Sequence, residues 1–138
     1  MSNLNNNMEN KMPKSKQIIP SNDQIEIILS EATIASAYWA STFEMKNGVQ
    51  YCDYYNPLWE LQVTYDDGVE MVTATLTIAK LKENWSTFVM YSNSRHFADL
   101  VQNKFDWTTA DCAFQIGLFD GVYFEGHDLE YDQCVQWV

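Results

Sequence analysis

The first patterned segment of the chain begins after Pro20, where apolar residues recur three or four positions apart. Ser21 or Asn22 can cap a helix at this point, and Asn47-Gly48 would break it. The spacing predicts one amphipathic helix of about five turns. Trp39 should be buried where the end of that helix meets a sheet. The apolar stripe comprises Ile25, Ile28, Leu29, Ala32, Ser36, Trp39 and Phe43.

Between residues 49 and 77 the pattern changes to a period of two, which predicts strands at 49–55, 58–65 and 69–77. Asn56-Pro57 ends the first strand, and Asp67-Gly68 is a tight-turn signal that joins the other two as a hairpin. We therefore expect an antiparallel meander with one face packed on helices. In the second strand Trp59, Leu61, Val63 and Tyr65 alternate with Glu60, Gln62 and Thr64.

Helical spacing then returns. A first face comprises Leu81, Trp85, Phe88 and Val89, and a further helix capped by Ser94 would turn Phe97, Leu100, Val101 and Phe105 inward. Residues 106–119 predict a last helix, with Thr108 and Asp111 in a capping-box-like start and Gly121 as its stop. Residues 122–138 add either a strand or a short helix.

Together these elements predict an α+β fold with an N-terminal helix, a three- to four-stranded antiparallel meander and two to three C-terminal helices. The length of 138 residues suits one domain. Residues 1–20 lack periodicity and are expected to form a flexible tail, so that 21–138 make up the domain. No apolar stretch approaches the roughly 20 residues of a membrane span, and residues 1–16 lack the apolar region of a secretory signal.

The chain is acidic, with a formal net charge of −11. Residues 106–138 contain seven acids and neither Lys nor Arg. Such a surface repels phosphate, which argues against direct nucleic-acid binding, and attracts a basic protein surface. The alternative is that the acids serve solubility.

Aromatic residues are dense beside Pro57, at Tyr51, Tyr54, Tyr55 and Trp59. Period-two alternation cannot turn all four toward one core, so some should be exposed. Exposed Tyr and Trp beside acids are typical of protein-binding surfaces. The alternative is that they belong to the core.

Asp111 and Gln115 stand one helical turn apart and are therefore neighbours on one face. They are either a possible ligand site or structural groups, with Asp111 capping Thr108 and Gln115 bonding the backbone. We favour the structural interpretation.

Other candidate chemistry is weak. Glu125, His127, Asp128, Glu130 and Asp132 offer cation ligands, but their spacing fits no calcium loop and favours a solvated acidic turn. A nucleophilic pair of Cys112 with His127 or His96 competes with a buried thiol. Cys52, Cys112 and Cys134 form no metal or redox motif, which suits reduced thiols in the cytosol. The single arginine, Arg95, argues against a nucleotide pocket.

One pairing of short motifs carries a family resemblance. Tyr38-Trp39-Ala40 precedes Asp106, Ala110-Asp111, Gln115, Leu118-Phe119 and Val122-Tyr123. This pattern resembles a family of small uncharacterised phage and prophage proteins over roughly residues 25–126. The family has Gly after Leu-Phe, where this chain has Asp120 and then Gly121. The resemblance implies a phage or mobile-element origin and no particular chemistry.

These observations favour a non-enzymatic phage or mobile-element protein that binds, and inhibits, a host protein with a basic surface. The partner would handle nucleic acid or serve defence in the host cytoplasm, and no cofactor is expected. The proposed contacts are Tyr51, Tyr54, Tyr55, Trp59, Glu125, Asp128, Glu130 and Asp132. One alternative is a small-ligand-binding or hydrolytic protein using Asp111, Gln115 and His127. Another is a virion or complex assembly component.

Overall fold

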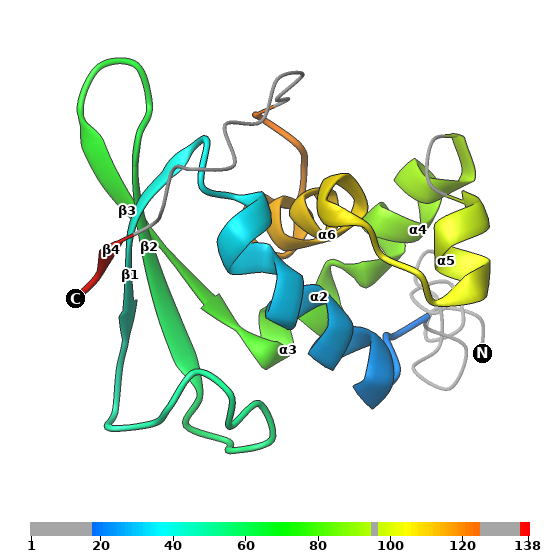
Figure 1. Ribbon diagram of the computed structural model, residues 1–138, viewed down its shortest axis with the longest axis horizontal. Helices are drawn as coiled ribbons and strands as arrows, with labels where there is room; N and C mark the ends of the chain where they lie inside the picture. Colours follow the sequence, from blue (N-terminus) through cyan, green and yellow to red (C-terminus); the bar gives the residue numbers. More distant parts are fainter. Residues whose placement is uncertain (1–17, 95–96, 125–135) are drawn as a thin grey trace, which may run out of the picture.

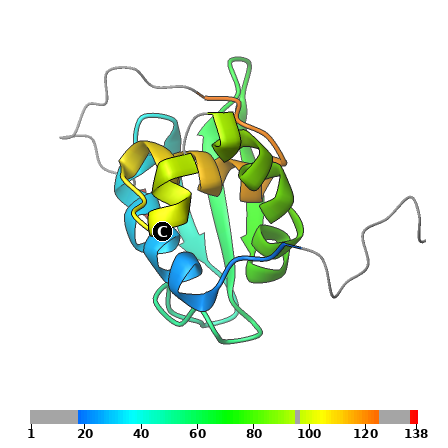
Figure 2. The same ribbon diagram turned by 90° about the vertical axis from the view of Figure 1, so that its right-hand side faces the viewer.

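The computed structural model describes residues 18–94, 97–124 and 136–138. Its helices gather on one face of a four-stranded sheet, as Figure 1 shows, and the view turned by 90° places the helical layer in front of the sheet (Figure 2). Helices and a sheet in separate layers confirm the α+β class. The proposed tail, apart from residues 18–20, lies outside the described residues.

The first helix, α2 (Asn22–Ala35), begins as predicted. Ser21 is its N-cap, and a capping box joins Ser21 to Gln24 in both directions, with Gln24 N donating to Ser21 Oγ at 3.1 Å and Ser21 N to Gln24 Oε1 at 2.9 Å. Ile25, Ile28, Leu29 and Ala32 are buried, as the stripe predicts.

The prediction that this helix continues to residue 47 is wrong, because it ends at Ala35 and residues Ala40–Met45 form strand β1. A register shift between Ala40 and Thr42 marks a bulge in that strand. It places buried Ala40 and buried Phe43 three residues apart on the inner face. The bulged strand therefore imitates helical spacing.

The sheet has the order β3-β2-β1-β4, with β2 at Glu60–Asp66, β3 at Met71–Thr77 and β4 at Gln136–Trp137. Strands β1, β2 and β3 pair antiparallel, whereas β4 pairs parallel to β1. The sheet is therefore mixed, which corrects the purely antiparallel meander. Since β4 comes from the far end of the chain, no hairpin fixes its direction. Of the tail 122–138, for which a strand and a short helix were both open, residues 136–137 form strand β4 and residues 125–135 lie outside the described residues.

The hairpin between β2 and β3 is confirmed. Gly68 has a φ of 97°, and Asp67 Oδ1 accepts hydrogen bonds from Val69 N and Glu70 N at 2.8 and 2.9 Å. On the inner face of β2, Leu61 and Val63 are fully buried, as the alternation predicts.

The strand predicted at 49–55 is absent, since residues 47–59 form a series of turns instead. Val49 N bonds Lys46 O at 3.2 Å, Asp53 N bonds Gln50 O at 3.1 Å and Trp59 N bonds Asn56 O at 2.9 Å. Asp, Asn, Gly and Pro residues in this segment favour turns over a strand.

Four helices follow among the described residues, rather than two or three: α3 (Ile78–Glu83), α4 (Trp85–Ser94), α5 (Phe97–Gln102) and α6 (Trp107–Phe119). Asn84 separates α3 from α4, and its Nδ2 donates to the carbonyls of Ile116 and Gly117 at 3.1 Å each. Leu81, Trp85 and Phe88 are buried as predicted. Val101, expected inward, is 63% exposed because α5 lies at the edge of the helical layer.

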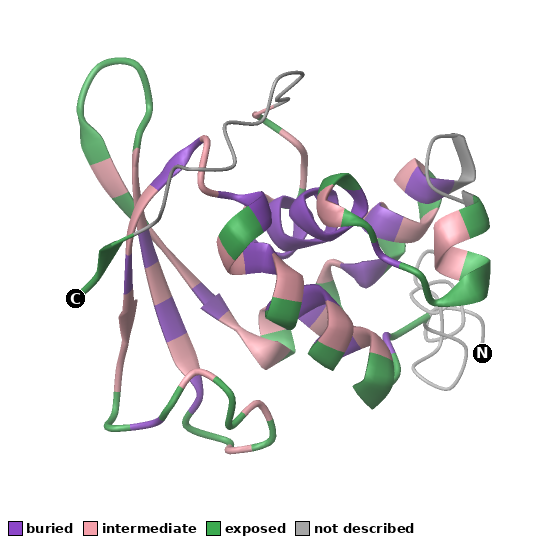
Figure 3. Ribbon diagram, in the orientation of Figure 1, coloured by how far each residue is buried: buried purple, intermediate pink, exposed green. Residues whose placement is uncertain are grey.

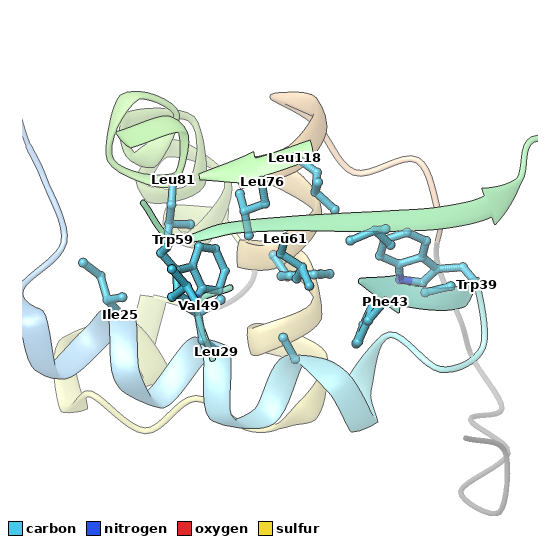
Figure 4. Packing of buried hydrophobic residues seen from close by; sticks show 14 residues of the cluster. Ile25, Leu29, Trp39, Phe43, Val49, Trp59, Leu61, Leu76, Leu81 and Leu118 are labelled. Atoms are coloured by element: carbon cyan, nitrogen blue, oxygen red, sulfur yellow. The ribbon is translucent and has the colours of Figure 1, made fainter. Parts of the chain in front are cut away.

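Helix α6 forms the centre of the molecule, and Figure 3 shows it buried along most of its length. Its Phe114 and Leu118 join the core against α2 and the sheet, part of which Figure 4 shows, while Ala113 and Ile116 join a second core among the helices. At Gly117 an added Cβ would lie 2.9 Å from Leu81 Cδ1, so glycine allows the close approach of α3.

Both predicted ends of α6 need correction. The N-cap is Asp106, which accepts from Thr109 N at 2.8 Å, so Thr108 and Asp111 form no capping box. The C-cap is Asp120, whose φ of 57° is left-handed, and Gly121 has no such conformation. Aspartate tolerates this region, and Thr87 Oγ1 donates to Asp120 Oδ1 at 2.6 Å.

Candidate functional site

The first candidate is a polar cluster on α6. It comprises Tyr38, Trp39, Asp111 and Gln115. The sequence predicts Asp111 and Gln115 as a possible site. It predicts only burial for Trp39, and Tyr38 enters only through the motif of the family resemblance. Asp111 Oδ1 accepts from Trp39 Nε1 at 2.8 Å, and its Oδ2 accepts from the Tyr38 hydroxyl at 2.5 Å and from Gln115 Nε2 at 3.0 Å. The hydrogen bonds from Tyr38 and Trp39 hold the turn that follows α2 against the middle of α6.

Gln115 extends the polar cluster to the chain beyond α6. Its Oε1 accepts from Tyr123 N and Phe124 N at 3.0 and 2.9 Å, and its Nε2 donates to Phe124 O at 2.8 Å. The ring of Phe124 stacks on Trp39, with centroids 5.1 Å apart and planes 2° apart. The backbone bonding expected of Gln115 is confirmed.

Asp111 and Gln115 are buried, 5% and 0% exposed, while Tyr38 is half-buried. Burial raises the pKa of Asp111 to about 6, while its bonds to Tyr38, Trp39 and Gln115 act in the opposite direction. Both protonation states complete the network. A carboxylate accepts from Tyr38, and a carboxylic acid donates to the Tyr38 hydroxyl, which then donates to Phe124 O at 2.8 Å. This geometry favours a structural role, although Asp111 is no cap.

The structure adds little evidence for a functional role of the remaining polar candidates. Cys112 is buried, 5% exposed, with its Sγ 3.9 Å from the Tyr91 hydroxyl oxygen, in keeping with a thiol packed in the core. Arg95, His96, Cys134 and the acidic segment with Glu125, His127, Asp128, Glu130 and Asp132 lie outside the described residues.

The second candidate is the loop 47–59, which carries the predicted aromatic residues. Its four rings divide into two pairs. Trp59 is 2% exposed and its Nε1 donates to Tyr51 O at 2.8 Å, while the Tyr51 hydroxyl donates to Leu29 O. Desolvation raises the pKa of Tyr51, and so does neighbouring Tyr54. Trp59 and Tyr51 therefore hold the loop against α2 and the core.

The other two rings differ in exposure. Tyr54 is half-buried, with its ring centroid 5.7 Å from that of Tyr51 and 6.3 Å from that of Trp59, and Tyr55 is 57% exposed. The expectation that some of these rings are exposed is thus confirmed. The reason differs, because turns and not strand alternation separate exposed Tyr55 from buried Trp59.

A pocket of about 590 Å³ lies beside these rings. Its lining includes the buried side chains of Trp59 and Ile25 and the exposed side chains of Tyr55 and Leu58. The lining comes from the loop, the first turn of α2 and the junction of β3 with α3. It comprises Asn22, Ile25, Asn47, Tyr54, Tyr55, Asn56, Pro57, Leu58, Trp59, Glu60, Thr77, Ile78, Ala79 and Lys82. We call this the aromatic pocket.

Acidic side chains lie around the aromatic pocket. The pKa of Tyr55 is raised first by partial desolvation, then by a hydrogen bond to Glu26 and by the charges of Glu26 and Asp23. Glu60 lines the pocket directly, and Lys82 brings one positive charge from α3. The contributions of Asn22, Ile25 and Lys82 have no signal in the sequence, because three distant segments assemble the wall.

The chain was compared with known protein families, curated proteins and solved structures, and it matches none of them. In the part of the chain that the structure describes, no three His, Cys, Asp or Glu side chains gather as a metal site would require. None of the helices described there is long and apolar enough to cross a membrane. Function is therefore inferred from the polar cluster and the aromatic pocket themselves.

Proposed function

We propose that this chain is a small acidic protein of phage or mobile-element origin that binds a basic surface on a host protein and catalyses no reaction. It would inhibit a nucleic-acid-handling or defence protein in the host cytoplasm by occupying positions that phosphates take. The origin rests on the resemblance carried by Tyr38-Trp39-Ala40 and residues 106–123.

The observation that carries the proposal is the aromatic pocket with carboxylates around it. Tyr55 and Leu58 present apolar surface to solvent, half-buried Tyr54 lines the pocket with them, and Glu60 and Glu26 supply negative charge nearby. Partly exposed aromatic rings give up water readily on binding and are frequent anchors of interfaces. The carboxylates would direct a basic partner toward them.

The charge of the described residues supports a basic partner. Their only cationic side chains with a permanent charge are Lys46, Lys80, Lys82 and Lys104. The carboxylates in the same ranges are Asp23, Glu26, Glu31, Glu44, Asp53, Glu60, Asp66, Asp67, Glu70, Glu83, Asp99, Asp106, Asp111 and Asp120. Such an excess raises the encounter rate with a positive surface and lowers it with a nucleic acid.

The ligand-binding or hydrolytic alternative receives no support from Asp111 and Gln115. Both are buried and engaged by Tyr38, Trp39 and the backbone of Phe124. A substrate would have to displace these bonds before it reached either side chain.

The test begins with capture of partners from host lysate on the immobilised full chain at low and high salt, followed by kinetics with the purified partner. Two double variants of equal charge are compared, one at the pocket (Asp23→Lys with Glu26→Lys) and one away from it (Glu70→Lys with Glu83→Lys). Because nearby charges act most strongly on encounter, the pocket variant should slow association several-fold more than its control.

A partner whose association is insensitive to salt and to both double variants would refute the acidic-binding proposal. Turnover of a substrate by the purified chain would refute its non-enzymatic part.

A further inference from the structure

We propose that the aromatic pocket receives one arginine side chain of the partner, an inference that rests on the proposed function. The guanidinium would lie against the rings of Tyr54 and Tyr55, with Glu26 as its counter-charge. This proposal specifies which positively charged group is recognised, whereas the acidity of the chain indicates only that the group is positive.

Size and shape are the first argument. A pocket of about 590 Å³ is within the range of sites for small ligands and exceeds what one side chain fills. It can therefore take an arginine together with the backbone on either side of it. Trp59 and Ile25 in its lining offer apolar contact to the methylene stem.

The rings and carboxylates together select a cation. Tyrosine and tryptophan faces attract cations, and guanidinium, being planar and weakly hydrated, stacks on them better than ammonium does. Glu60 lines the pocket, and the negative charges of Glu26 and Asp23 act on Tyr55. A phosphate or carboxylate ligand would meet the repulsion of these same groups.

Lys82 limits where the cation can sit. It comes from α3, whereas Tyr55 comes from the loop 47–59, and it would repel a cation that bound close to it. We place the guanidinium beside Tyr55, where the negative charges of Glu26 and Asp23 act. One arginine fits this arrangement better than a run of basic residues.

The loop is organised before any ligand binds. Asn47 Nδ2 donates to Leu58 O at 2.9 Å, Leu58 N donates to Asn56 Oδ1 at 2.9 Å, and Asn56 Nδ2 donates to Asp53 Oδ2 at 3.1 Å. A loop held in this way loses little conformational freedom on binding, so more of the contact energy appears as affinity.

The experiment uses the full chain, isotope-labelled for NMR, and four capped Gly/Ser peptides that differ at one central residue: arginine, citrulline, lysine or glutamate. Citrulline keeps the shape of arginine and lacks its charge. We expect the arginine peptide to bind roughly tenfold more tightly than the citrulline peptide and more tightly than the lysine peptide. Its shifts should centre on residues 54–60 and 78–82.

Two pocket variants and two controls complete the design. Tyr55→Ala and Glu26→Gln should each weaken the arginine peptide about fivefold or more, since each removes one of its contacts. Tyr123→Ala and Glu70→Gln alter exposed side chains away from the pocket lining, and they should leave the affinity for the arginine peptide unchanged. The inference would be overturned if the arginine and citrulline peptides bound equally well. It would also be overturned if the two control variants lost affinity for the arginine peptide.

The chain's own basic residues are a competing occupant. A triple variant tests this, with Lys11→Gln, Lys14→Gln and Lys16→Gln combined. If it binds the arginine peptide more than about tenfold more tightly than wild type does, the N-terminal segment fills the pocket and the inference is overturned. Failure here is separable from failure of the proposed function. A salt-sensitive partner indifferent to Tyr55→Ala refutes the pocket alone, whereas the lack of any basic partner refutes the proposed function.

Discussion

The polar cluster and the aromatic pocket are built from the same kinds of side chain, tyrosine, tryptophan and carboxylate, yet they differ in where their polar atoms and rings are directed. In the polar cluster the side chains bond one another and the backbone, and Asp111 is 5% exposed. In the aromatic pocket Tyr55 is 57% exposed and Leu58 60%.

The difference separates a structural role from the proposed binding role. Buried polar groups with complete hydrogen bonding stabilise one arrangement of the chain and have nothing left to offer a ligand. Apolar surface left in water beside charges still has free energy to gain from a partner. Substitutions in the two regions should consequently affect different quantities.

The largest expected effect comes from Trp39→Ala in the polar cluster. Trp39 is 7% exposed, stacks on Phe124 and donates to Asp111, so its removal leaves both a cavity and an unpaired acceptor. The free energy of unfolding should fall by roughly 3–5 kcal/mol in denaturant titrations. A loss below about 1 kcal/mol would contradict the assigned burial.

Asp111→Asn should show how the polar cluster responds to pH. The amide introduces a donor beside Gln115 Nε2, which lies 3.0 Å from Asp111 Oδ2, and should cost on the order of 1 kcal/mol at pH 7. The pKa of Asp111 is raised from 3.8 to about 6, so protonation favours the folded state. This contribution is complete below about pH 4 and is lost as pH rises through about 6.

The stability gap between wild type and Asp111→Asn should therefore widen by about 2 kcal/mol from pH 7 to pH 4. Urea titrations at both values measure it, and the difference between the two proteins cancels the other carboxylates. A gap that stays constant with pH, or that narrows toward pH 4, would show that Asp111 does not titrate as its burial requires.

Tyr54→Ala and Tyr55→Ala should affect partner binding more than stability, unlike the substitutions in the polar cluster. Because Tyr55 is 57% exposed, its removal should cost less than about 1 kcal/mol of stability. Dissociation of the partner should accelerate roughly tenfold with little change in association, as expected for an anchor side chain. Surface plasmon resonance separates the two rates, and unchanged dissociation in both variants would count against the pocket.

Charge reversal of Glu125, Asp128, Glu130 and Asp132 should have a smaller effect. We expect association to slow several-fold at low salt, with dissociation nearly constant, because charge acts on encounter across about 8 Å at physiological ionic strength. If neither the charge reversals nor the tyrosine variants change the association or dissociation rate, solubility remains as the explanation of the charge.

Deletion of residues 1–18 should have the smallest effect. The segment has no apolar periodicity, and Ser21 with Gln24 caps α2 without it. The melting temperature should change by no more than a few degrees. A larger drop in a thermal melt would show that the segment contributes to the fold.

Local patterns in the sequence predicted local structure. The capping position of Ser21, the Asp67-Gly68 hairpin and the alternation of Leu61 with Val63 all follow from contacts within a few residues. The prediction was wrong where distant pairing decided the outcome. A bulge between Ala40 and Thr42 gave strand β1 helical spacing, and β4 joined the sheet from the other end of the chain.

The two candidate regions were predictable to different degrees. The proximity of Asp111 and Gln115 followed from helical geometry, whereas Tyr38 and Trp39 reach them only through tertiary packing. The aromatic residues of the pocket were evident from composition. Its remaining wall from α2 and α3 was not, because no local pattern records which segments meet around a loop.

The most direct test of the binding role is an NMR titration of the full chain with its identified partner, following each backbone amide. The aromatic pocket predicts that the first and largest shifts fall at residues 54–60 and 78–82, close to the pocket lining. Large shifts confined to the β2–β3 hairpin or to α4, with the loop 47–59 unchanged, would contradict it.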